Sequence, residues 1–229
     1  MRPFAQAVWA SRYQYSRDGT IVDADLEATF ARVARAVAQV EADPDLWSAR
    51  YAAALTELRF LPGGRILAGA GTDKQVTLFN CFVSGPLDDS IPGILDSLKE
   101  TAMTMQQGGG VGVDFSTLRP RGAVARKTGA TASGPVSFMH IWDSLCETQL
   151  ATSSRRGALI GVLRCDHPDI IEFIEAKLDR GALNNFNLSV LITDAFMAAV
   201  SRNDEWPLHD PGGGAVHRHV GARELWQRI

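Results

Sequence analysis

A chain of 229 residues is long enough for one ordinary domain, or for one domain with a small appendage. Its 45% hydrophobic and 21% charged residues are globular values, and its net charge of −3 gives no electrostatic reason to expect nucleic-acid or membrane binding. No apolar run approaches the roughly eighteen residues of a membrane span, and the N-terminus lacks a signal-peptide pattern. We therefore expect a cytoplasmic protein.

The three cysteines, Cys81, Cys146 and Cys165, are far apart in the sequence and odd in number. This spacing argues against a disulfide framework and against a CxxC zinc site. We expect reduced thiols and no metal site. A special role for one cysteine would then be catalytic redox chemistry.

The first third of the chain predicts a small helical region. Residues 1–20 mix aromatic and charged side chains and are typical of an extended arm. Apolar residues at three- and four-residue steps predict a helix from Asp23 to about Val40, and Pro44 suits the first turn of a second helix that ends near Leu58. We expect residues 1–59 to form this region and residues 60–229 to form an α/β domain.

Residues 60–72 (FLPGGRILAGAGT) are a glycine-rich connector with one charge, Arg65. Such a loop is either a plain turn or a backbone contact to a phosphate. It lacks the GxxxxGK[ST] spacing of a P-loop.

The chain is organised around residues 76–116. Residues 76–83 (VTLFNCFV) predict a strand that is apolar on both faces, as in an α/β sheet covered on both sides, and this strand carries Asn80 and Cys81. A helix over 91–107, glycines at 108–110 and a second strand follow. This order is the reverse of a dinucleotide-binding fingerprint. Three glycines exceed the needs of a helix end, which suggests close approach to a bulky group.

Two polar groups flank this helix and strand. Asp88, Asp89 and Ser90 are N-cap candidates, and the alternative role for a carboxylate here is to accept hydrogen bonds from a ribose hydroxyl. Residues 117–134 form a polar loop that either is solvated or holds a phosphate with four cations. These cations are Arg119, Arg121, Arg126 and Lys127.

The second half continues the alternation of helices and strands. The predicted elements are a helix over 135–152, a basic hinge over 153–157, a strand over 158–163, a helix over 169–178, a strand over 186–193, a helix over 195–201 and a helix over 221–229. His167 lies beside a helix start without a second His or Cys, so we expect a structural role. We assign no chemistry to His209, His217 and His219 in a poorly patterned tail. The succession predicts an α/β sheet or barrel.

With these residues in place, the chain resembles the large catalytic subunit of ribonucleotide reductases, and most of all their class II, adenosylcobalamin-dependent branch. The motifs that carry the resemblance are FLPGGRILAGAGT, TLFNCFV, the DDS turn, TMQQGGGVGVDFSTLRPRG, TGATASGPVSFMHIWD, SRRGA, LRCDHPDIIEFIEAK and FNLSVLITDAFM. The resemblance implies an N-terminal helical region followed by the first half of a ten-stranded α/β barrel.

The resemblance also implies roles for individual residues. Cys81 matches a thiol that is oxidised when the ribose 2′-hydroxyl leaves as water. Asn80, Gly110 and Arg65 match substrate-binding positions, Arg65 across a gap in the alignment. The implied site for a deoxynucleoside triphosphate effector contains Asp88 or Asp89, with Arg119 and Arg156. The helices over 91–107 and 135–152 would form a homodimer interface.

Parts of the family's pattern are missing from the 229 residues. The finger loop with its N-x-C-x-E pattern, the second redox cysteine and the C-terminal cysteine pair are not found. We therefore expect a chain that is catalytically incomplete alone and needs a C-terminal half or a thioredoxin-type reductant. Two other interpretations stay open: a nucleotide-binding regulatory module without turnover, and a thiol-bearing α/β domain without a nucleotide role.

Overall fold

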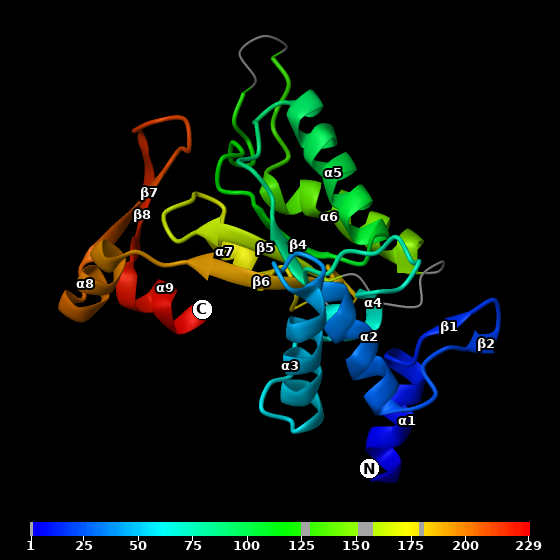
Figure 1. The fold of residues 1–229 in the computed structure, drawn as a ribbon. Coiled ribbons are helices and arrows are strands. Elements are labelled where there is room, and N and C mark those ends of the chain that lie inside the picture. Colours follow the sequence, from blue (N-terminus) through cyan, green and yellow to red (C-terminus); the bar gives the residue numbers. More distant parts are fainter. Residues whose placement is uncertain (1, 125–128, 151–157, 179–180) are drawn as a thin grey trace. The chain divides into compact units, whose positions relative to one another are not determined.

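A computed structural model of the chain describes residues 2–124, 129–150, 158–178 and 181–229 (Figure 1). The chain divides into two compact units, Met1–Asn80 and Cys81–Ile229. The boundary predicted at residues 59 and 60 stays a prediction. Within the described residues, no helix is both long enough and apolar enough to cross a membrane.

The first unit is mainly helical. It contains α1 (Pro3–Arg12), a small hairpin of β1 (Ser16–Arg17) and β2 (Thr20–Ile21), α2 (Leu26–Ala38), α3 (Pro44–Thr56) and α4 (Gly64–Gly69). The predicted extended arm is wrong, because Pro3 starts a helix whose Trp9 is buried. The predicted connector over 60–72 likewise contains a short helix, α4.

A buried ion pair crosses the interior of this unit. Asp23 and Arg32 lie 2.8 Å apart, with only 2% and 6% of their side chains exposed. Asp23 also accepts hydrogen bonds from the Thr29 hydroxyl and the Tyr15 backbone N–H, while Arg32 donates to the carbonyls of Leu67 and Ala70. The pair therefore ties α2 to the β1–β2 hairpin and to α4.

The second unit contains a four-stranded parallel sheet. Its strands are β3 (Cys81–Val83), β4 (Gly110–Asp114), β5 (Leu159–Arg164) and β6 (Phe186–Leu191), in that spatial order. The connections contain α5 (Ile91–Gln106), α6 (Pro135–Leu150) and α7 (Ile170–Glu175). Helices alternate with parallel strands, so the predicted α/β succession is confirmed.

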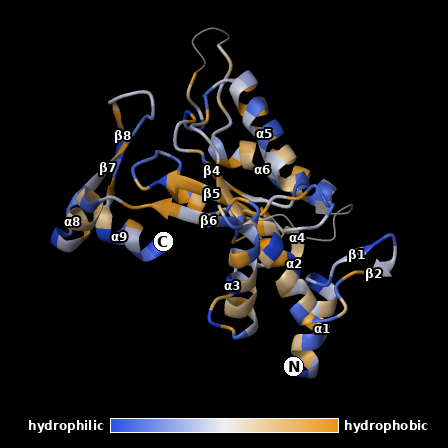
Figure 2. Cartoon of the chain, viewed as in Figure 1, coloured by the Kyte–Doolittle hydropathy of each residue, from blue (hydrophilic) through white to orange (hydrophobic). Residues whose placement is uncertain are grey.

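The two faces of this sheet differ in composition. On one face, Val113, Leu159, Leu163 and Phe186 are buried in a core that also contains Trp142 of α6. Helices α5 and α6 lie side by side over the sheet in Figure 1, and Figure 2 shows β5 and β6 as mainly hydrophobic ribbons. The other face has half-buried or exposed residues on every strand, and we call it the open face.

The predicted first strand is shorter than expected. Only Cys81–Val83 pairs, whereas the prediction covered residues 76–83 and expected cover on both faces. Residues 76 and 78 instead contact α4: a Cβ added to Gly69 would lie 2.9 Å from Val76 and 3.1 Å from Leu78. Val83 is 92% exposed because its side chain points to the open face, where its neighbour on β4 is Gly112.

The tail that lacked a clear pattern forms an antiparallel hairpin, β7 (Glu205–His209) with β8 (Val216–Gly221). It lies between α8 (Asp194–Arg202) and α9 (Ala222–Arg228) in sequence. Trp206 packs edge-on against Phe196 of α8, which anchors the hairpin to the core. Glycines 213 and 214, both with positive φ, form its turn.

Candidate functional site

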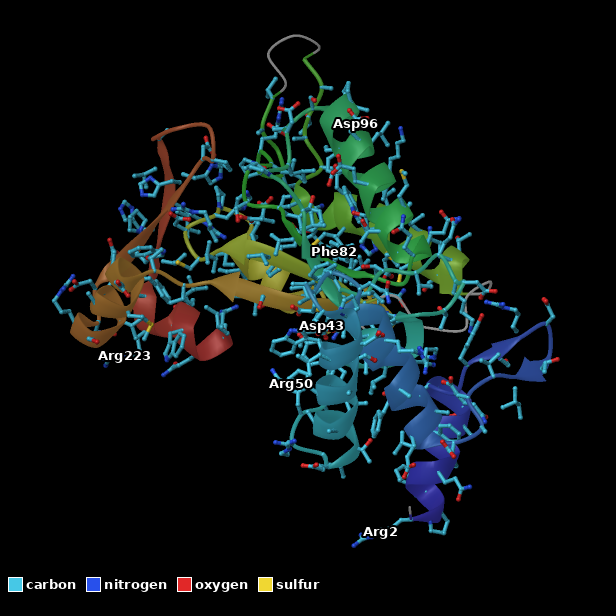
Figure 3. The ribbon with its side chains drawn as sticks, viewed as in Figure 1. Arg2, Asp43, Arg50, Phe82, Asp96 and Arg223 are labelled. Atoms are coloured by element: carbon cyan, nitrogen blue, oxygen red, sulfur yellow. The ribbon has the colours of Figure 1, made fainter. Side chains whose placement is uncertain are left out.

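Cys81 lies at the start of β3, directly opposite Gly110 of β4. Side chains alternate along a strand, so Cys81 and Val83 point to the open face while Phe82 points to the helices. Phe82 is labelled in Figure 3. A Cβ on Gly109 would lie 2.7 Å from the Phe82 ring and 2.8 Å from Thr104. The second glycine of the triplet is therefore required by packing within the chain.

The surface beside Cys81 on the open face has little side-chain bulk. Gly110 is its direct neighbour, and Gly112 follows one row further along the sheet, opposite Val83 and Ile160. A Cβ added to Gly112 would have no neighbour closer than 3.9 Å. A ligand next to the Cys81 thiol would therefore meet glycine backbone.

The three thiols have different surroundings. Cys81 is exposed, while Cys146 and Cys165 are fully buried. Burial, followed by neighbouring carboxylates, raises the pKa of Cys146, and burial also raises the pKa of Cys165. Because the thiolate is the reactive form, the two buried cysteines are poorly suited to redox chemistry. Of the three thiols, only that of Cys81 is accessible to a ligand.

Arg65 and Asn80, two of the residues with predicted substrate contacts, belong to the first unit. Arg65 lies in the first turn of α4 and is half-buried. Asn80 is exposed, and its side-chain amide lies next to Gly63. Within the second unit, the structure brings Cys81 and Gly110 together.

A second cluster lies at the start of α5. The Arg119 Nε lies 2.6 Å from an Asp89 carboxylate oxygen, and its Nη2 donates to the Asp89 carbonyl at 3.1 Å. These side chains remain 38% and 33% exposed. Asp88 is placed differently, because its carboxylate accepts a hydrogen bond from the Ser90 hydroxyl, and Ser90 caps α5. Arg156, the fourth predicted effector residue, lies outside the described residues.

The Asp89–Arg119 pair borders an open cleft of about 1180 Å³. The cleft is also lined by Asp114, Ser116, Arg164, Asp166, His209 and Asp210. None of these residues has a predicted site role. A usable signal existed, because Asp114 and Arg164 end their strands, and ligands of parallel α/β sheets bind beyond the carboxyl ends of strands.

Contacts among these residues fix part of the cleft wall. The Arg164 guanidinium donates to Asp166, and this hydrogen bond holds the pKa of the Asp166 carboxyl below its usual range despite partial burial. The Arg164 backbone N–H donates to the Ser116 hydroxyl at 2.9 Å. The cleft thus offers both cations and carboxylates, a combination that suits a ligand with phosphates and hydroxyls.

Helices α5 and α6 expose several apolar side chains away from the sheet. These residues are Ile91, Leu95, Met103 and Ile141. On α5, positions 91 and 95 are one helical turn apart, so their side chains lie on the same surface. Exposed apolar side chains that share a helix surface are a common feature of protein interfaces.

Family comparisons cover both units. Residues 79–228 match the model of the ribonucleotide reductase barrel domain, and residues 2–75 match the model of the ribonucleotide reductase all-alpha domain. A vitamin B12-dependent ribonucleoside-diphosphate reductase of Mycobacterium tuberculosis is 42% identical over 184 residues, which are 80% of this chain and 26% of the relative.

Two further relatives come from other sources. A vitamin B12-dependent ribonucleoside-diphosphate reductase of Thermoplasma acidophilum is 40% identical over 79% of this chain and 23% of its own length. A putative ribonucleoside-diphosphate reductase large subunit of Frog virus 3 is 36% identical over 69% of this chain and 27% of its own length. The chain thus spans about a quarter of the curated relatives that it matches. Its first unit corresponds to the all-alpha domain and its sheet unit to the barrel domain, and the chain belongs to the ribonucleotide reductase family.

Proposed function

We propose that the chain takes part in the reduction of ribonucleotides to 2′-deoxyribonucleotides, with Cys81 as one of two thiols that supply the electrons. In this reaction the bond between carbon 2′ and its hydroxyl breaks, and the hydroxyl leaves as water after taking up a proton. Hydrogen is delivered to carbon 2′, and two thiols become a disulfide, which accounts for the two electrons.

The observation that carries the proposal is the pairing of the exposed Cys81 with Gly110 on the open face of the sheet. A thiol fixed on a strand has a defined position, and glycine backbone lets a sugar ring approach it closely. Gly110 provides this close backbone, and Asn80 and Arg65 are further substrate contacts. The buried Cys146 and Cys165 do not serve as the second thiol.

The second part of the proposal is an effector site for a deoxynucleoside triphosphate at the cleft beside α5. Asp89 accepts hydrogen bonds from the ribose, and Arg119 binds a phosphate. The support is the half-exposed pair of the two side chains at the edge of a cleft with further charged groups. Arg156 is a further effector contact implied by the resemblance, and Asp88 acts with Ser90 at the start of α5.

Radical generation is assigned to adenosylcobalamin on the strength of the relatives' printed names. The described cleft is assigned to the effector, and the resemblance places the contacts to this cofactor mostly outside the 229 residues. We therefore assign it no step here. The chain works as a homodimer through the exposed apolar residues of α5 and α6. A thioredoxin-type reductant returns the disulfide to thiols.

The test uses the complete enzyme, in which this chain is joined or mixed with sequence that supplies the N-x-C-x-E cysteine. Cys81→Ser is expected to abolish formation of deoxyribonucleotides while effector binding stays unchanged. Cys146→Ala is the matched control and should keep turnover, because its thiol is buried. Full turnover by Cys81→Ser would remove Cys81 from its role.

A second candidate function is a nucleotide-binding regulatory module that lacks turnover. The observation in its favour is that Asp89 and Arg119 pair within the second unit beside the cleft, whereas only one of the three cysteines, Cys81, is exposed. Effector binding without any reductase activity, even after the missing sequence is supplied, would favour this alternative. Absence of both would favour an α/β domain without a nucleotide role.

A further inference from the structure

The turn between β5 and α7 contains the sequence His167-Pro168-Asp169, and its side chains contact the loop that carries Arg119 on both sides of that arginine. We propose that this turn, here called the HPD turn, is a positioning element that holds Arg119 in its binding orientation. The inference deepens the proposed function and rests on it, because it concerns the proposed effector site.

His167 holds the loop before Arg119. Its ring is buried, and Nε2 lies 2.9 Å from the backbone carbonyl of Leu118. A carbonyl accepts hydrogen bonds only, so Nε2 carries the proton. Nδ1 then has a free lone pair, and it accepts the backbone N–H of Asp169 at 3.0 Å. Both nitrogens are used within the protein, which leaves neither for a metal ion or for proton transfer.

Asp169 holds the loop after Arg119. Its Oδ2 accepts the backbone N–H of Arg121 at 2.8 Å. The Arg121 side chain also pairs with Glu172, one turn further along α7. Gly134 passes close to the same carboxylate, where an added Cβ would lie 2.7 Å from Oδ2. Since Gly134 also has φ +83, a larger residue at this position would disturb the Asp169 contact.

Arg119 lies between the two anchored residues in the sequence. Its side chain reaches Asp89 while its neighbours at 118 and 121 are tied to the HPD turn. The Thr117 hydroxyl donates to the Leu87 carbonyl and so links the loop to the turn that contains Asp89. The backbone on each side of the phosphate-binding arginine is therefore fixed before a ligand arrives. Pre-organisation of this kind improves affinity because less order has to be created on binding.

The test compares two amide substitutions in the full 229-residue chain. His167→Asn places an oxygen near the position of Nδ1, so it keeps the acceptor for Asp169 but is too short to reach Leu118. His167→Gln places an amide N–H near the position of Nε2 and keeps the donor to Leu118. Affinity for each of the four deoxynucleoside triphosphates is measured by calorimetry, and folding is checked by circular dichroism and thermal unfolding.

We expect His167→Asn to weaken binding by about tenfold, the effect of losing one buried hydrogen bond, and His167→Gln to stay within about threefold of the parent. In an Arg119→Ala background, His167→Asn should cause no additional loss, since the residue acts through Arg119. A purely structural His167 would lower affinity equally in the Asn and Gln variants and in both backgrounds.

The Asp169 pair keeps the inference testable if His167→Asn does not fold. Asp169→Asn retains an oxygen acceptor for the Arg121 N–H, and Asp169→Ala removes it, so Ala should weaken binding more than Asn. If the parent binds the triphosphates and Arg119→Ala does not, but the HPD variants bind like the parent, the inference is wrong. If the parent binds none of the four, the proposed effector site itself is wrong.

Discussion

The Asp23–Arg32 pair of the helical unit and the Asp89–Arg119 pair of the sheet unit join the same residue types at short distance, but the two pairs differ in how far they are exposed. Asp23 and Arg32 of the helical unit are 2% and 6% exposed, and the remaining donors of Arg32 are used by backbone carbonyls. Asp89 and Arg119 of the sheet unit are 33% and 38% exposed and border a cleft. A similar pair of residue types thus has a structural role in one unit and is available for ligand binding in the other.

Burial explains the difference. Charged groups in an interior keep their stabilising effect only if every polar atom is satisfied, and the loss of one partner leaves the other charge without compensation. For Asp23, burial alone would raise its pKa, but hydrogen bonds from Arg32, Thr29 and Tyr15 together lower it. The more exposed pair has water as an alternative partner, so its contribution to stability is small.

The largest expected effect is on the stability of the helical unit. Arg32→Ala leaves the buried Asp23 carboxylate without its counterion and should lower the free energy of unfolding by about 3–5 kcal/mol. Urea unfolding followed by circular dichroism would measure this change. Arg119→Ala is the matched control, for which we expect a loss of at most about 1 kcal/mol. Equal losses in the two variants would contradict the assignment of separate roles.

The second largest expected effect is on ligand binding, for which Arg119 matters more than Arg32. Arg119→Ala should weaken binding of a deoxynucleoside triphosphate on the order of ten- to a hundredfold, because it removes charge-assisted hydrogen bonds to a phosphate. Binding would be measured by calorimetry. Arg119→Lys keeps the charge but loses the planar donor arrangement and should lie between the parent and Ala. An unchanged affinity in Arg119→Ala would exclude this residue from the effector site.

The same contrast shows what the sequence was able to predict. Pro44 and Ser90 mark helix starts through local chemistry, so α3 and α5 begin at the expected residues. The β7–β8 hairpin was missed because its stability comes from Trp206 packing on Phe196, a tertiary contact that no short window contains. Residues 76–80 resemble a strand, but Val76 and Leu78 pack against α4 instead.

The candidate site was less accessible to sequence reasoning than the fold. The motifs offered either Asp88 or Asp89 to act together with Arg119, which lies about thirty residues further along the chain. Only the structure distinguishes the two aspartates, because Arg119 contacts Asp89 whereas Asp88 contacts Ser90. His167 was expected to have a structural role because it lies beside a helix start without a second His or Cys. Its contact with Leu118 spans 49 residues and depends on the register of β4 with β5. Such contacts follow from topology and have no local pattern.

The smallest effect is a difference in how the two units respond to acid. Burial lowers the pKa of His167 from its ordinary value of 6.5, although the nearby carboxylates of Asp169, Asp166 and Asp210 oppose this shift. The unfolded chain therefore binds the proton first. The stabilisation due to the neutral ring is fully present above pH 6.5. It is lost as the pH falls from 6.5 through the lower pKa that His167 has in the folded chain.

The helical unit should not respond in this range. Asp23 has a lowered pKa, so its contribution is present above 3.8 and is lost only as the pH falls through its folded value. Hydrogen exchange measured by mass spectrometry between pH 7.5 and 5.5, corrected for the intrinsic pH dependence of exchange, would follow both units in one sample. We expect the free energy of opening to fall in residues 110–121 and 164–175 but not in residues 26–38, and His167→Gln to remove most of that fall. A parallel loss in both units would indicate that general charge repulsion, rather than His167, causes the acid response.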